Sequence, residues 1–126
     1  MRFLSEEWAR AVTDGLNASA EFQQAAANTT TIIQQVVTDP PDGGDLRYWL
    51  SIDAGTATLG MGDNQDAEIT ITQSYATAVA LATGELSAVS AYMGGQLQVS
   101  NVMKAMSLQG TLQALGPVIK ATPCEY

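Results

Sequence analysis

Hydrophobic and polar residues alternate along the middle of the chain with a period of two. The alternation occupies three blocks, residues 46–54, 56–61 and 67–72, which are separated by turns that contain glycine and aspartate. Because side chains of a strand point alternately to the two sides of a sheet, each block predicts a strand with one apolar face. Residues 29–38 are crowded with β-branched side chains and predict a strand before these blocks. Short connections favour antiparallel neighbours, so we expect residues 29–72 to form a four-stranded antiparallel meander.

The N-terminal part of the chain has a helical period instead. Ser5 supplies a capping hydroxyl and precedes two glutamates, which suit the positive end of a helix dipole. From Trp8 to Phe22 the apolar residues recur at spacings near three and four, so we expect a helix that begins after Ser5. Trp49 falls on the polar face of its strand. Three placements are open for this side chain: at the gate of an opening, stacked on a partner, or under the N-terminal helix. We favour the last, in which Trp49 forms a second small core with Trp8 and Phe22.

A helical period returns after residue 73. Residues 74–83 and 86–93 predict two short helices that stop at glycines, and residues 96–100 alternate as a short fifth strand does. Asn101 is a suitable N-cap for a final helix with a broad apolar stripe, which the dipeptide at 116–117, Gly-Pro, can kink or end.

Charge is distributed unevenly between the two parts of the chain. The formal net charge is −8, from five Lys and Arg and thirteen Asp and Glu. Residues 1–73 carry eleven acids and three bases, whereas residues 74–126 carry two of each. The C-terminal part must therefore bury most of its surface or present some of it to an apolar partner.

Composition excludes several classes of function. Apolar residues make up 46% of the 126 positions, which is enough for a core, and we expect one domain over residues 1–126. The five cations do not cluster, so an acidic protein of this kind is not expected to bind nucleic acid or an anionic bilayer. Histidine is absent, which removes the usual general base and the usual imidazole metal ligand.

We expect neither a metal nor a cofactor. Cys124 is the sole cysteine, so there is no intrachain disulfide or thiolate cage, and Asp39, Asp42 and Asp45 lack the spacing of a calcium-binding EF-hand. No apolar run approaches the length of a membrane span, and the N-terminus lacks the apolar stretch of a signal peptide. These observations predict a cytoplasmic protein without stable membrane insertion.

The order of the elements is similar to that of a known family. After a leading helix come residues 48–52 (Tyr-Trp-Leu-Ser-Ile), residues 67–72 (Ala-Glu-Ile-Thr-Ile-Thr) before a short helix, and residues 97–99 (Leu-Gln-Val) before a methionine-bearing helix. Together they resemble the sterol carrier protein type 2 family over residues 5–119. Many relatives have a glycine after the last strand, where this chain has Ser100.

This resemblance implies an α+β fold with a five-stranded, mostly antiparallel sheet whose one face is covered by helices. It also implies a hydrophobic tunnel between the sheet and the C-terminal helices, which holds an apolar ligand such as a fatty acid, a sterol-like molecule or another lipid. Candidate ligand-binding residues are the apolar side chains that face this space from the sheet and from the C-terminal segment: Tyr48, Leu50, Leu59, Ile69, Ile71, Met93, Met103, Met106 and Leu112.

The leading hypothesis is thus a non-enzymatic carrier of an apolar small molecule or lipid. A second hypothesis is an interaction or accessory module whose apolar C-terminal helix forms a homodimer or partner interface. A third is an enzyme that uses the cavity for a small apolar substrate, with Asp53, Glu68 or Tyr75 as acid or base, because a carboxylate in an apolar cavity can have its pKa raised toward neutrality.

Overall fold

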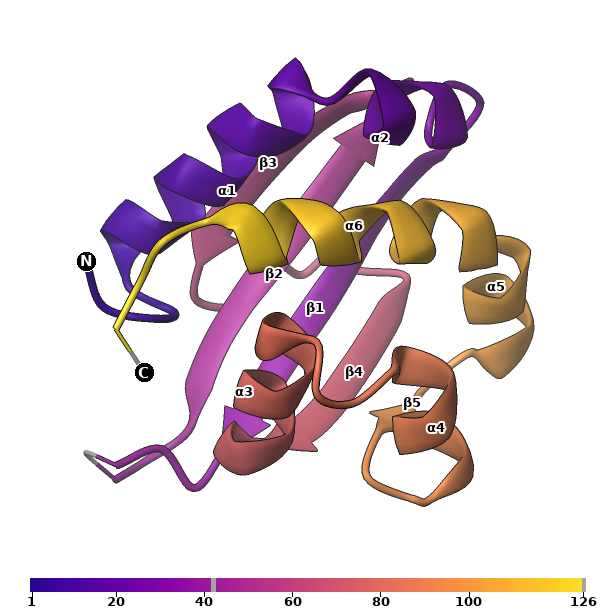
Figure 1. Cartoon of the computed structure of the whole chain (residues 1–126). Helices are drawn as coiled ribbons and strands as arrows, with labels where there is room; N and C mark the ends of the chain where they lie inside the picture. Colours follow the sequence, from indigo (N-terminus) through magenta and orange to yellow (C-terminus); the bar gives the residue numbers. More distant parts are fainter. Residues whose placement is uncertain (42, 126) are drawn as a thin grey trace.

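The computed structural model describes residues 1–41 and 43–125, with the backbone alone for Ala88 and Val89. One layer is a five-stranded sheet, and the helices form a second layer on one of its faces (Figure 1). The strands are β1 (Thr30–Thr38), β2 (Leu46–Asp53), β3 (Thr56–Met61), β4 (Ile69–Ser74) and β5 (Gln98–Val99). The helices in this part of the chain are α1 (Glu6–Ala18), α2 (Ala20–Ala25), α3 (Tyr75–Thr83), α4 (Ala88–Met93), α5 (Val102–Ser107) and α6 (Gln109–Ala121).

Side-chain caps fix where most of the helices begin. The Ser5 hydroxyl accepts a hydrogen bond from the Trp8 backbone N–H at 3.2 Å, and Asn101 caps α5 in the same way, which confirms both predicted N-caps. The predicted leading helix is interrupted at Ser19, which ends α1 and caps α2. The predicted final helix is likewise divided at Leu108 into α5 and α6.

The sheet has the strand order β3-β2-β1-β4-β5, and β1 pairs with β4 in parallel while the other pairs are antiparallel. The fold class is therefore as expected, a mostly antiparallel sheet covered by helices on one face. The predicted four-stranded meander is wrong, because β4 does not pair with β3. The chain leaves β3 at one side of the sheet, crosses behind β2 and β1, and returns as a parallel neighbour of β1 (Figure 1).

Helix α1 is one physical reason why β4 cannot pair with β3. The Asn17 side chain donates to the Ala57 carbonyl at 2.9 Å and accepts from the Ala57 N–H at 2.8 Å. The Thr13 hydroxyl accepts from the Leu59 N–H at 2.9 Å. These bonds satisfy the outer edge of β3, so no strand is needed there and none can approach.

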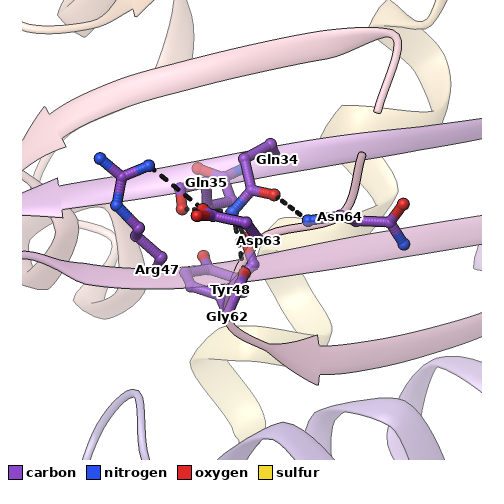
Figure 2. Close-up of polar contacts among 7 residues, drawn as sticks. All are labelled: Gln34, Gln35, Arg47, Tyr48, Gly62, Asp63 and Asn64. Atoms are coloured by element: carbon purple, nitrogen blue, oxygen red, sulfur yellow. Dashed lines mark hydrogen bonds and ion pairs between the residues drawn. The ribbon is translucent and has the colours of Figure 1, made fainter. Parts of the chain in front are cut away.

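Gln34 on β1 holds the crossing segment in place. Its side-chain Nε2 donates to the carbonyls of Tyr48 and Gly62 at 3.0 Å each, and its Oε1 accepts from the Asn64 N–H at 2.7 Å (Figure 2). The side chain is 5% exposed because the crossing segment covers it. Arg47 adds an exposed ion pair with Asp63 at 3.1 Å across the same segment (Figure 2).

The hydrophobic core lies between the sheet and the helices. Trp8 and Phe22 are fully buried in it together with Leu50, so they join the main core instead of forming a second one. The expectation for Trp49 is wrong, because its side chain lies outside this core. Its indole packs instead over Gly60, where any added Cβ would overlap the ring.

Candidate ligand-binding site

Helix α6 crosses over the sheet and rests mainly on other helices. It contacts α1, α2, α3 and α5, and Thr111 donates to the Ala25 carbonyl at 3.0 Å (Figure 1). The side chains of α6 that are buried are two small ones, Thr111 and Ala114. Its larger apolar side chains pack against the core but stay partly exposed; they are Leu112, Leu115, Val118 and Ile119. The apolar face of α6 is therefore covered incompletely.

The structure separates the nine predicted site residues into two groups. Six of them lie in or against the core between the sheet and the helices: Tyr48, Leu50, Leu59, Ile69, Ile71 and Leu112. The other three are methionines on the surface, with Met93 81% exposed, Met103 85% and Met106 70%. The sheet residues thus lie where the sequence predicts, whereas the methionines flank the helical layer from outside.

Other exposed apolar side chains accompany the three methionines on α4 and α5. Helix α5 has no buried residue, and Tyr92 and Val102 are exposed beside the methionines in sequence. The one cation within α5, Lys104, contacts the Glu68 carboxylate at 3.6 Å. Both short helices lie at the β5 end of the molecule (Figure 1). We call this set of exposed side chains on α4 and α5 the methionine surface.

A polar cluster that the sequence pattern did not reveal lies inside the helix-covered face. Gln73 on β4 donates from Nε2 to the Gln35 Oε1 at 3.2 Å, and Gln35 is the register partner of Tyr48. Burial raises the pKa of the Tyr48 hydroxyl above its ordinary value, so this group is neutral at physiological pH. Alternation within each strand puts Gln35 on the face of Ile33 and Gln73 on the face of Ile71, and the parallel register of β1 with β4 then brings the two glutamines together.

The candidate acid and base residues are spread over different parts of the fold. Asp53 is exposed at the end of β2, where the Thr30 hydroxyl lies 3.5 Å from its carboxylate. Glu68 is exposed and contacts Lys104, and Tyr75 packs its ring against Phe3. The structure does not bring these three groups together.

The described residues contain no group of three or more acidic or cysteine side chains arranged to hold a metal ion. Asp42, one of the three aspartates that lack the spacing of an EF-hand, lies outside these residues. In the same part of the chain, no helix combines the length and the hydropathy needed to cross a bilayer.

A shallow groove of about 360 Å³ runs along the outside, where α1 meets α6. It is lined mainly by Ala11, Gly15, Pro117 and Val118, and an added Cβ on Gly15 would lie 2.9 Å from a Val118 methyl group. The two helices therefore approach closely at Gly15, which fixes the end of α6 nearest the C-terminus.

The fold and this site define a small α+β domain in which one sheet face and a loosely covered helix enclose an apolar layer. The model of the SCP-2 sterol transfer family matches residues 9–113, and the chain belongs to this family of lipid- and sterol-binding domains. No curated protein sequence gives a significant match.

Several solved structures share the fold. A crystal structure of sterol carrier protein 2 is 22% identical, with a TM-score of 0.85 over 97% of this chain and 100% of that one. A protein from Thermus thermophilus described as possibly sterol carrier protein is 25% identical, with a TM-score of 0.80 over 99% and 92%. Sterol carrier protein 2 from Yarrowia lipolytica, in its apo form, is 26% identical, with a TM-score of 0.67 over 90% and 93%.

Proposed function

We propose that this protein binds and carries an apolar ligand, a fatty acid, a sterol-like molecule or another lipid, between the helix-covered face of the sheet and helices α5 and α6. The observation that carries the proposal is the incomplete cover of α6, whose large apolar side chains are only partly buried. Leu112 and its apolar neighbours on α6 gain contacts when a ligand occupies the layer beneath them. Leu50, Ile69 and Ile71 form the opposite wall on the sheet.

The energetic requirement is modest. Burial of apolar surface contributes about 0.8 kcal/mol per methylene, so a twelve-carbon chain gains about 9 kcal/mol before ordering costs. A micromolar dissociation constant corresponds to about 8 kcal/mol. The acidic balance of the chain disfavours a bulky polyanionic head group, so uncharged or singly charged ligands fit best.

The methionine surface has a defined role in this proposal. Unbranched thioethers adapt to ligands of different shape, and Met103 and Met106 lie on α5, which has no buried side chain. We place them at the entrance, where α5 moves away from the sheet to admit the ligand and then packs onto it. Met93 on α4 lines the same entrance from the other short helix.

Binding of a fluorescent apolar probe with an uncharged end group to delipidated protein tests the proposal. We expect saturable binding at micromolar concentration with one site per chain. The double variant Met103→Gln and Met106→Gln should weaken binding several-fold, whereas Met61→Gln, an exposed methionine on β3, should not. No saturable uptake by the wild-type protein would contradict the proposal.

A second candidate function is a protein interface formed by the methionine surface. The observation that favours it is the strong exposure of Met103 and Met106 together with Val102 on α5, since exposed apolar side chains gathered on one surface mark interaction sites. Light scattering distinguishes the two functions. A homodimer that Met103→Asp converts to a monomer, with no lipid in the purified sample, would favour the interface over the carrier.

A further inference from the structure

Three buried side-chain polar atoms have no hydrogen-bond partner among the described residues, and two of them belong to one cluster on the helix-covered side of the sheet. These two are Nε1 of Trp8, whose side chain is 1% exposed, and Oε1 of Gln73, which is 8% exposed. A buried polar group without a partner is unfavourable, because it has lost its hydrogen bonds to water, so both atoms favour a state in which something bonds to them.

These atoms belong to one continuous cluster. The Trp8 ring packs edge-on against Tyr48 with 5.6 Å between ring centroids, and Tyr48 is the register partner of Gln35. Gln35 in turn accepts the hydrogen bond from Gln73. The cluster therefore joins α1, β2, β1 and β4 under the helical layer. Phe3 covers it, with ring contacts to Trp8 at 5.3 Å and to Tyr75 at 5.9 Å.

We propose that this cluster, Trp8, Gln35, Tyr48 and Gln73, binds the polar end of the ligand and selects a neutral hydroxyl over a carboxylate. The inference rests on the proposed function, which supplies the apolar remainder of the ligand. A hydroxyl donates one hydrogen bond, which Gln73 Oε1 accepts, and it accepts hydrogen bonds such as the one that Trp8 Nε1 has free to donate.

The charge of the cluster explains why a carboxylate is rejected. All four side chains are neutral, and an ionised carboxylate cannot donate to Gln73 Oε1. A desolvated anion needs a paired cation or several strong donors. Of the chain's five cations, Arg10 and Arg47 bond to carboxylates at the surface, Lys104 contacts Glu68, and Lys120 lies beside Gly84. The fifth, Arg2, is exposed, and its backbone forms a bridge with Glu125.

Three ligands share the same twelve-carbon chain and differ in their end group: dodecan-1-ol, its methyl ether and dodecanoate. Differences in their affinities therefore report the contribution of the end group. Each ligand competes with a fluorescent apolar probe for delipidated protein at pH 8. The ether accepts but does not donate, so the alcohol should bind about three- to tenfold more tightly than the ether, because a net hydrogen bond contributes that much. Dodecanoate should bind at least about tenfold more weakly than the alcohol.

Gln73→Leu removes the acceptor and introduces an apolar side chain of similar size. In this variant the preference for the alcohol over the ether should disappear while the affinity for the ether stays the same. Trp8→Phe keeps an aromatic ring but loses the N–H donor. It should therefore lower the affinity for both the alcohol and the ether. Thr31→Val is the matched control, because the Thr31 hydroxyl is also buried and without a partner yet lies outside the cluster.

The outcomes separate this inference from the proposed function. If all three ligands displace the probe equally, or if Gln73→Leu keeps the alcohol preference, the hydroxyl site is refuted and the carrier function stands. If the probe itself shows no saturable binding, the carrier function fails and the hydroxyl site fails with it. The comparison of alcohol with ether in the wild-type protein needs no variant to fold.

Discussion

Asn17 bonds to Ala57 as a neighbouring strand would, with its side-chain amide donating to the backbone carbonyl at 2.9 Å and accepting from the backbone N–H at 2.8 Å. One side chain thus satisfies both backbone groups of a residue at the sheet edge. This pairing holds α1 along β3 and directs the chain that leaves β3 toward the far side of β1. The position of α1, and of Trp8 upon it, therefore depends on an edge contact.

Asn17→Leu should lower the free energy of unfolding by about 2 kcal/mol, because both backbone groups of Ala57 lose their partner. Chemical denaturation measures the change. Asp14→Ala, an exposed substitution on the same helix, should stay within about 0.5 kcal/mol of the wild type. Equal stability of the two variants would show that water replaces the amide without cost.

Gln34→Leu should destabilise the protein more, because it removes four hydrogen bonds from a side chain that is 5% exposed. We expect the free energy of unfolding to fall by about 2–3 kcal/mol. Hydrogen exchange at the Asn64 amide should become faster, because this amide loses its acceptor. Gln65→Leu, an exposed change in the same segment, is the control. Unchanged protection of Asn64 in the Gln34 variant would contradict the role given to Gln34.

Gly60→Ala should destabilise the protein, since the new Cβ overlaps the Trp49 indole and the ring must leave its place. A cost of about 1–3 kcal/mol is typical of such overpacking. Gly110→Ala on α6 meets no atom within 4 Å and should instead stabilise the protein by about 0.5–1 kcal/mol. Thermal unfolding, followed by tryptophan fluorescence, compares the stability of the two variants. Similar changes in stability in both would argue against the packing of Trp49 over Gly60.

The raised pKa of Tyr48 predicts a loss of stability in alkali. Below about pH 10 the folded and unfolded states both keep the proton, so the stabilising contribution is fully present. Above that pH the unfolded chain ionises first, and the free energy of unfolding falls until the pH passes the folded-state pKa. The free energy of unfolding of the Tyr48→Phe variant should fall less steeply above about pH 10 in urea titrations. Parallel curves would mean that the Tyr48 hydroxyl is not desolvated.

The sequence predicted the elements of this fold better than their pairing. Ser5 and Asn101 mark helix starts through local chemistry, and the alternation over residues 46–54 marks a strand whatever its neighbours are. Pairing depends on contacts between distant residues, such as Gln34 with Asn64. An isolated glutamine in a strand carries no sign of the segment that it will bind.

In the candidate site, too, local sequence patterns predicted some features, whereas others depend on contacts between distant residues. Leu50 and Ile69 follow from alternation, because the apolar side of a strand faces the core. Met103 and Met106 follow the period of a helix, but the period does not say whether anything covers that helix. The polar cluster required the register of β1 against β4, since only that register brings Gln35 and Gln73 together.

The most direct test of the carrier proposal is an NMR titration of delipidated protein whose five methionine methyl groups are labelled with ¹³C. On addition of dodecan-1-ol, we predict that the signals of Met93, Met103 and Met106 shift and saturate near one equivalent while that of Met61 stays in place. Signals that stay in place at every concentration, or that shift for all five methionines without saturation, would contradict a ligand held beneath the C-terminal helices.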